Sequence, residues 1–154
     1  MSKQVFAIDV GGVLASQQHD GEPIAGALAA LIVLNEVFEL QLISMCGPKK
    51  ATATYLWLRQ HGLEQYFKGQ TYIPYSHQNK NAELVRVKAS FFIDDRWKHI
   101  GPALEIKGLN CFHLNTLNEK KVSVSPQYNP VETWEEVMFK LMLKGLIPKM
   151  QLTA

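Results

Sequence analysis

Five short apolar runs, separated mostly by segments with helical spacing, constrain the fold of this chain more than any other feature. The runs are residues 4–8, 39–44, 70–73, 89–93 and 110–114. Their lengths and their content of branched and aromatic residues are typical of buried strands. Strands that alternate with helices form a parallel sheet with helices on both faces. The pattern therefore predicts an α/β fold: a three-layer Rossmann-like domain whose central parallel sheet has about five strands.

The segments between these runs carry the helical signals. Apolar side chains recur in them at intervals of three and four residues, and glycines stand where two of the helices would stop. We therefore expect helices over residues 24–38, 49–61, 81–88 and 97–107.

The last part of the chain differs from the rest. Residues 121–129 are polar, and residues 130–145 have the apolar spacing of an amphipathic helix. We expect a single domain over residues 1–154, in which residues 121–154 form a C-terminal extension whose helix docks on the sheet layer. A homodimer contact through the mixed face of this helix is the alternative. Residues 147–154 carry no clear pattern.

Length, composition and charge limit the class of protein. The chain has 154 residues, 47% of them hydrophobic and 19% charged, as in an ordinary soluble domain with a full core. The net charge of +2 and the lack of a dense Lys and Arg stripe argue against a nucleic-acid surface. Two cysteines are too few for a disulfide framework, no apolar stretch could span a bilayer, and the start lacks a secretory signal. We expect a cytoplasmic protein without a membrane partner.

Three of the predicted strands end in polar side chains. Asp9 follows the first apolar run, Ser44 ends the second, and Asp94 and Asp95 follow the fourth. Lys80 opens the short helix that precedes the fourth run. Because the carboxyl ends of parallel strands meet at one edge of the sheet, we expect these groups to share one crevice.

This set of groups suits phosphoryl transfer. Mg²⁺ prefers oxygen ligands, which Asp9 together with Asp94 or Asp95 can supply. A carboxylate can also attack phosphorus, so Asp9 is the candidate for an aspartyl-phosphate. Ser44 and nearby backbone N–H groups can hold phosphate oxygens, while Lys80 neutralises charge on the transferred group.

Each of these residues also has a plain structural interpretation. Asp9 alone could cap a turn, and Ser44 could cap a helix. Lys80 could be a solvated surface lysine, with Lys49 and Lys88 as rivals for its role. The order in which the groups occur along the chain favours the functional interpretation.

That order resembles the four motifs of the haloacid dehalogenase (HAD) superfamily of hydrolases and phosphatases. The resemblance covers roughly residues 4–115. It rests on one apolar strand that ends in Asp, a second that ends in Ser, a following Lys, and a strand that ends in an Asp pair. The first and last of these motifs are fairly specific, whereas a lone Ser or Lys is not.

The resemblance implies a phosphoric monoester hydrolase that depends on Mg²⁺. In the family the first aspartate, here Asp9, is the nucleophile. The backbone carbonyl two residues later, here that of Gly11, joins it on the metal. The second acid of the last motif is commonly the direct metal ligand, which favours Asp95 over Asp94.

The substrate expectations follow from the same resemblance. We expect the phosphate to be bound by Gly11, Gly12, Ser44, Met45 and Lys80. The substrate would be a phosphorylated small molecule or a nucleotide.

The main departure from the family pattern is Gly11. Phosphatases of the family usually have Asp at this position, where it protonates the leaving group and then activates water. Loss of a positioned acid/base typically lowers a rate by about 10²–10⁴-fold. His19, Asp20 or Glu22 of the following loop could supply a substitute. The alternative function is therefore a catalytically weak or inactive HAD-like protein that acts by binding.

A second departure is the absence of room for a cap domain. Residues 10–43 are filled by one loop and one helix, and residues 45–79 by a helix, a strand and a loop. An open crevice would admit a bulky substrate or would need a partner chain as a lid. A response-regulator receiver domain is disfavoured because its acid pair lies near the first strand. A dehalogenase would not need the acid pair that ends the fourth strand.

Overall fold

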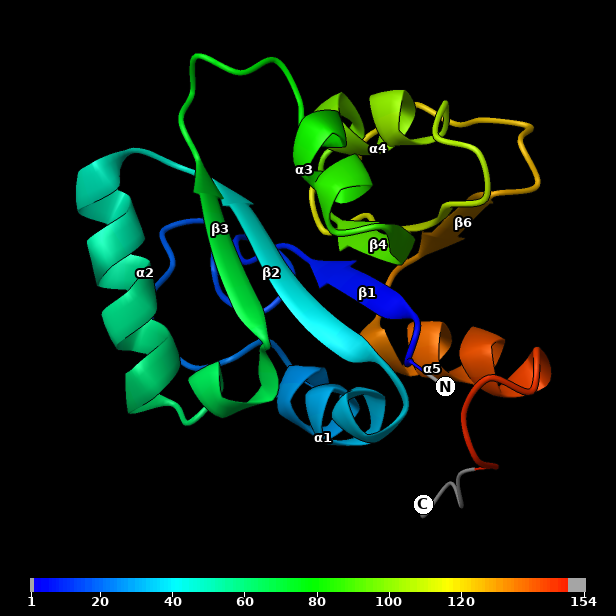
Figure 1. The fold of residues 1–154 in the computed structure, drawn as a ribbon, viewed down its shortest axis with the longest axis horizontal. Helices are drawn as coiled ribbons and strands as arrows, with labels where there is room; N and C mark the ends of the chain where they lie inside the picture. The colour runs from blue at the N-terminus through cyan, green and yellow to red at the C-terminus, as the bar shows by residue number, and fades with distance from the viewer. Residues whose placement is uncertain (1, 150–154) are drawn as a thin grey trace.

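A six-stranded sheet, all parallel, forms the centre of the structure, a computed structural model that describes residues 2–149 (Figure 1). The strands lie in the order β3-β2-β1-β4-β5-β6. Their bounds are β1 Val5–Ile8, β2 Glu39–Met45, β3 Gly69–Ile73, β4 Ala89–Asp94, β5 Asn110–Leu114 and β6 Tyr128–Val131.

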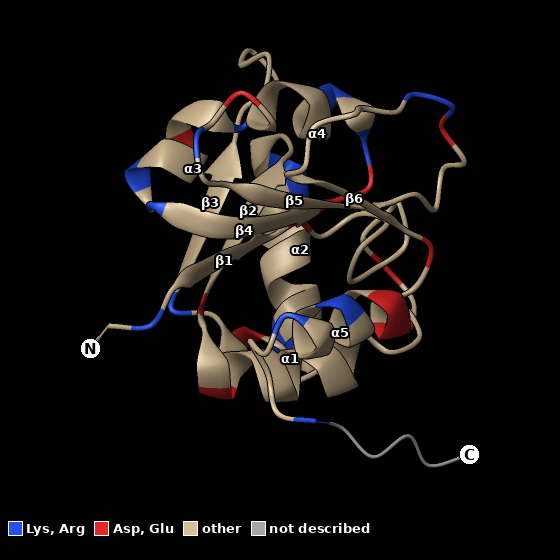
Figure 2. Ribbon diagram, turned by 90° about the vertical axis from the view of Figure 1, so that its right-hand side faces the viewer, with Lys and Arg blue, Asp and Glu red and all other residues tan. Residues whose placement is uncertain are grey.

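Five α-helices of the described chain cover the two faces of this sheet (Figure 2). On one face lie α1 (Ala27–Val37), α2 (Pro48–Gln60) and α5 (Trp134–Leu143). On the other lie α3 (Asn81–Arg86) and α4 (Trp97–Ala103). A short 3₁₀ helix, η1 (Glu64–Tyr66), precedes β3. The α/β fold with three layers is the one that the sequence predicted.

The sheet buries apolar side chains on both faces, which is why its central strands read as continuous apolar runs. Every residue of β1 is buried. Phe6 and Ile8 join the core under α1, α2 and α5, whereas Ala7 points to the core under α3 and α4. The alternation along β1 thus divides the interior into two layers.

The sixth strand was not predicted from the sequence. Tyr128–Val131 pairs with β5, in a region that we expected to be polar loop and helix start. Pro130 is tolerated here because β6 lies at the edge of the sheet. On the outer side of an edge strand, a missing backbone N–H removes no hydrogen bond between strands. The last helix consequently begins at Trp134 rather than at residue 130.

The helix α5 is anchored at its start. The Thr133 hydroxyl accepts a hydrogen bond from the backbone N–H of Glu136, a side-chain cap of the usual kind. The indole N–H of the buried Trp134 donates to the carbonyl of Val13 at 2.8 Å. The tail is thereby fixed to the segment after β1. Residues 150–154 of the expected extension lie outside the described residues.

The strand order places a topological switch point at β1. From β1 the chain moves to β2 and β3 on one side, then crosses to β4, β5 and β6 on the other. At such a point the segments that leave two neighbouring strands turn to opposite faces of the sheet, and a crevice opens at the carboxyl edge. The segments that follow β1 and β4 bound that crevice.

No separate cap domain is present among residues 2–149, in agreement with the short intervals between the motifs. The same residues contain no helix with the length and hydropathy needed to cross a membrane. The two cysteines, Cys46 and Cys111, are both free and buried.

Candidate functional site

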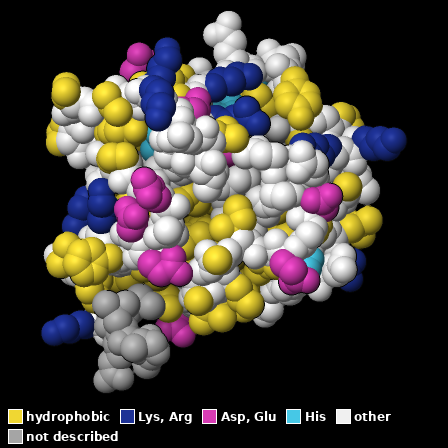
Figure 3. Space-filling model, turned by 180° about the vertical axis from the view of Figure 1, so that it is seen from behind, with side chains coloured by type: hydrophobic (Ala, Val, Ile, Leu, Met, Phe, Trp, Pro, Cys, Tyr) yellow, Lys and Arg dark blue, Asp and Glu magenta, His cyan; other side chains and the backbone are white. Residues whose placement is uncertain are grey.

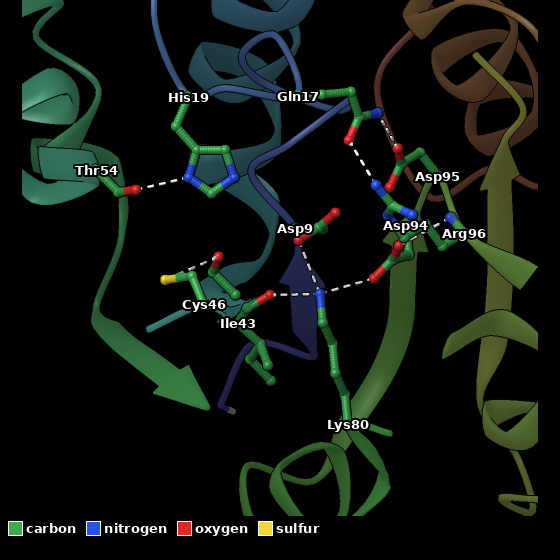
Figure 4. Close-up of polar contacts among 11 residues, drawn as sticks. Asp9, Gln17, His19, Ile43, Cys46, Thr54, Lys80, Asp94, Asp95 and Arg96 are labelled. Carbon is green, nitrogen blue, oxygen red and sulfur yellow. Dashed lines mark hydrogen bonds and ion pairs between the residues drawn. The ribbon is translucent and has the colours of Figure 1, made fainter. Parts of the chain in front are cut away.

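The ammonium group of Lys80 lies at the centre of the crevice, and all three of its protons are used (Figure 4). Its Nζ donates to Oδ1 of Asp9 at 2.8 Å, to Oδ2 of Asp94 at 2.7 Å and to the carbonyl of Ile43 at 2.9 Å. Burial lowers the pKa of Lys80, but the adjoining carboxylates of Asp9 and Asp94 outweigh that effect and raise the pKa overall. The side chain therefore stays a cation although it is almost fully buried.

Three buried carboxylates form a cluster here, and two of them, Asp9 and Asp94, contact this cation. Asp9, Asp94 and Asp95 each offer an oxygen within 4.8 Å of the others. Burial, reinforced by the charge of Asp94, raises the pKa of Asp9. Burial, followed by the charges of Asp9 and Asp94, raises the pKa of Asp95 to about 9. One lysine does not neutralise this cluster, so a second cation would stabilise its ionised form.

The two acids at the end of β4 differ in how their oxygens are used. Asp94 has both oxygens bonded, one to Lys80 and the other to the backbone N–H of Arg96 at 3.0 Å. Asp95 accepts a hydrogen bond on Oδ2 from the amide of Gln17 at 2.5 Å, whereas its buried Oδ1 has no hydrogen-bond partner. A buried acceptor without a partner is costly unless a ligand fills it, which marks Asp95 as the better cation ligand.

A close backbone approach explains the glycine at position 12. Gly12 has φ +73°, and a Cβ atom there would collide with Oδ2 of Asp95. Only glycine fits this contact without displacing the carboxylate. Gly12 does not line the cleft described below, and its carbonyl accepts a hydrogen bond from Thr116 at 3.1 Å.

A cleft of about 230 Å³ opens onto Asp9 and Lys80. It includes most of the residues that we expected to bind substrate. Its lining consists of Asp9, Gly11, Gln17, His19, Ser44, Met45, Lys50, Tyr75, Lys80, Arg96, Lys98 and His99. The structure thus brings Asp9, Ser44 and Lys80 to one cavity, whereas Asp94 and Asp95 lie beside Asp9 without lining it.

Ser44 lies buried at the carboxyl end of β2, on the wall of the cleft. Its hydroxyl makes only a long contact, 3.9 Å, with Sγ of Cys46 among the described residues. The helix α2 begins shortly after it, with Gly47 as the N-cap and no side-chain cap. A hydroxyl and free helix N–H groups at this place are suited to an anion.

The rim of the cleft is basic. Lys50, Arg96 and Lys98 line it, and no ion pair joins them to a carboxylate of the described chain. From behind, basic side chains gather near the top of the molecule beside a histidine, and most acidic side chains of that face lie lower (Figure 3). The rim would therefore attract an anionic ligand.

Several of these lining residues were not predicted from the sequence. They are Gln17, Lys50, Tyr75, Lys98 and His99. Lys98 and His99 lie in the first turn of α4, shortly after the acid pair. Their closeness in sequence to the end of β4 could therefore have identified them as lining residues. Gln17 and Lys50 carried no such signal, because only the path of the loop after β1 and the placement of α2 bring them to the cleft.

The rivals considered for two roles lie on the surface. Lys49 and Lys88 are exposed, whereas Lys80 is buried against Asp9. Asp20 and Glu22 are also exposed and do not line the cleft.

The remaining candidate for the missing acid, His19, is 8% exposed and lines the cleft with Asp9 and Gly11. Burial, followed by the charge of Lys50, lowers its pKa to about 4.

The comparisons with known proteins bear on the fold. No family model and no curated protein matches the sequence. A solved structure of an uncharacterized protein from Listeria monocytogenes serotype 4b is similar, with 15% identity and a TM-score of 0.68. The similarity covers 91% of this chain and 97% of that one.

Two further solved structures are named as HAD-type hydrolases. A haloacid dehalogenase-like family hydrolase from Xanthomonas campestris has 16% identity and a TM-score of 0.60, over 81% of this chain and 55% of that one. A HAD-hydrolase from Bacillus subtilis, solved bound to magnesium, has 20% identity and a TM-score of 0.59, over 80% of this chain and 58% of that one. The chain thus has the fold of HAD-like hydrolases, and spans little more than half the length of these two.

Proposed function

We propose that this protein is a Mg²⁺-dependent phosphatase that hydrolyses phosphate monoesters through an aspartyl-phosphate on Asp9. One observation carries the proposal. Lys80 bridges Asp9 and Asp94 at the carboxyl edge of the sheet, next to the partnerless Oδ1 of Asp95. This arrangement places a nucleophile and a fixed positive charge on the cleft, with a candidate cation site among the three acids beside them.

The residues at the site fit a Mg²⁺ ion. Carboxylate oxygens are the ligands that this ion prefers, and the three acids lie close enough to share one. Asp9 and Asp95 would hold it, together with the carbonyl of Gly11, while Asp94 is held by Lys80. Bound there, Mg²⁺ would supply Lewis-acid stabilisation of the phosphoryl oxygens. The Bacillus subtilis hydrolase of the same fold was solved with bound magnesium, which supports the assignment.

The protein groups have distinct parts in the proposed reaction. Lys80 holds Asp9 through Oδ1 and so leaves Oδ2 available to attack phosphorus. The bond from Asp9 to phosphorus forms as the bond from phosphorus to the leaving oxygen breaks. Ser44 and the backbone N–H groups beside it would hold the phosphoryl oxygens in line for this attack.

The substrate class follows from the cleft and its rim. A phosphorylated small molecule or a nucleotide fits the basic rim of Lys50, Arg96 and Lys98. Since no cap covers the cleft within residues 2–149, a bulky substrate could also enter. The homodimer stays a prediction; the exposed Phe139 and Leu143 on α5 are its candidate contact, and sedimentation analysis would test it.

A second function is favoured by Gly11. A protein with no acid at this position could bind metal and phosphate and yet turn substrate over slowly, acting by binding. The phosphatase and the binding protein would hold the metal with the same residues, so the rate of turnover distinguishes the two functions.

Hydrolysis of an aryl phosphate with and without Mg²⁺ tests the proposal. Such a substrate has a good leaving group and needs little acid help. We expect turnover that requires Mg²⁺ and is lost in Asp9→Asn, which keeps the size of the side chain but removes the nucleophile. Mg²⁺ binding without hydrolysis of any phosphate ester would contradict the phosphatase and support the binding protein.

A further inference from the structure

The imidazole of His19 is held in one tautomer by its neighbours. Its Nδ1 lies 2.6 Å from Oγ1 of Thr54 (Figure 4). The Thr54 hydroxyl donates its single proton to the carbonyl of Lys50 at 2.8 Å, so towards His19 it accepts. The network therefore assigns the ring proton to Nδ1 and leaves Nε2 as a bare acceptor.

This bare nitrogen faces Gly11. A Cβ atom at position 11 would lie 2.8 Å from Nε2 of His19 and 3.2 Å from its Cδ2. The imidazole thus occupies the space into which any side chain at position 11 would project. Nε2 makes no hydrogen bond within the described chain, and both residues line the cleft with Asp9.

We propose that Nε2 of His19 is the general base that activates water for hydrolysis of the aspartyl-phosphate on Asp9. The inference rests on the proposed function, since it assigns the second half of that reaction. The water oxygen forms a bond to phosphorus and its proton passes to Nε2. The bond from phosphorus to Asp9 breaks, its electron pair returns to the carboxylate, and inorganic phosphate leaves. The imidazolium then releases the proton to solvent through the open cleft.

Other loop residues do not fit this role. Asp20 is exposed, and its carboxylate accepts a hydrogen bond from Ser16 at 2.7 Å, away from the cleft. Glu22 is exposed as well.

Rapid-quench kinetics of His19→Ala with an aryl phosphate and Mg²⁺ test the proposal. We expect a burst of aryl alcohol followed by steady-state turnover slower by about 10²–10⁴-fold, because the first step needs no base and the second does. Intact-mass measurement should show the phosphorylated protein accumulating. Glu22→Gln, from the same loop, is the matched control and should behave as the wild type.

The outcomes separate this proposal from the phosphatase itself. Turnover of His19→Ala at the wild-type rate, or slow turnover without phosphorylated protein, would overturn the role of His19 and leave the phosphatase standing. A wild-type protein that hydrolyses no phosphate ester would overturn both.

A residue swap tests the shared position directly. Gly11→Asp alone should reduce activity, because its Cβ meets the imidazole. In the His19→Ala background the same change should restore part of the lost turnover, since the new carboxylate can enter the vacated space. If Gly11→Asp lowers turnover by the same factor in the wild-type protein and in His19→Ala, the imidazole and the new carboxylate do not compete for the same space.

Discussion

Nζ of Lys80 lies 2.8 Å from Oδ1 of Asp9, although 71 positions separate the two residues in the chain. The parallel sheet makes this contact, since it brings the end of β1 beside the segment that enters α3. Because both groups are buried, removal of either one would leave the other as an uncompensated charge in the interior. The pair thus links the stability of the fold to the geometry of the site.

Replacement of Lys80 by Met should therefore destabilise the protein as well as disable it. Asp9 and Asp94 would lose their shared cation, and breaking a buried pair from one side typically costs about 3–5 kcal/mol. Urea unfolding measures the loss. Lys88→Met, at an exposed position, is the control and should change stability by less than about 0.5 kcal/mol. Similar losses in the two variants would argue against the bridge.

Gly12→Ala should impair metal binding beyond its effect on the backbone. The new Cβ would collide with Oδ2 of Asp95 and displace the expected ligand. Gly108→Ala is a matched control, since Gly108 has φ +81° with open space around it. Both variants should lose about 1–2 kcal/mol from the positive φ, but calorimetry should show weakened Mg²⁺ binding in Gly12→Ala alone. Unchanged binding in Gly12→Ala would mean that Asp95 is not a ligand.

The metal-free protein should lose stability as the pH rises from about 7 to 9. Burial and the neighbouring charges raise the pKa of Asp95 to about 9, so the folded protein holds a proton that the unfolded chain releases. The folded state then binds more protons, and its free energy of unfolding falls with increasing pH. The contribution is full below the unfolded pKa of 3.8 and is lost as the pH approaches 9.

Thermal melts in chelator between pH 7 and 9 measure this slope. Asp95→Asn should make it shallower, and saturating Mg²⁺ should flatten it because the ion binds the ionised carboxylate. An identical slope in Asp95→Asn would show that another group controls the pH dependence. This window lies above the range in which His19 and His99 contribute, because the pKa of each is lowered to about 4.

Thr54→Val should slow turnover by roughly 10–100-fold, the range found when a metal-bound histidine loses the partner that orients its ring. The change removes the acceptor that holds Nδ1 of His19, so both the ring orientation and the tautomer are released. Thr54→Ser keeps the hydroxyl and should restore most of the rate, while Val keeps the shape of the side chain. A value of kcat that is unchanged in Thr54→Val would rule out this positioning role.

The fold and the main site residues could be predicted because their signals are local. Each apolar run identifies a strand by its own composition, and the polar residue at its end then has a known place at the edge of a parallel sheet. Asp9, Ser44 and the acid pair at 94–95 were located in this way. The strand β6 escaped prediction because its polar sequence with Pro130 lacks that signal, and only pairing with β5 makes it a strand.

The sequence by itself determined the class of fold and which strand ends carry reactive groups, because periodicity and strand length are properties of neighbouring residues. Tertiary structure alone decided how those groups are used. The contact of Gln17 with Asp95 joins residues 78 positions apart, and Thr54 of α2 fixes His19 of the loop after β1. The tertiary structure also places the imidazole of His19 in the space beside Gly11. Such contacts depend on how packed elements meet, so no local pattern encodes them.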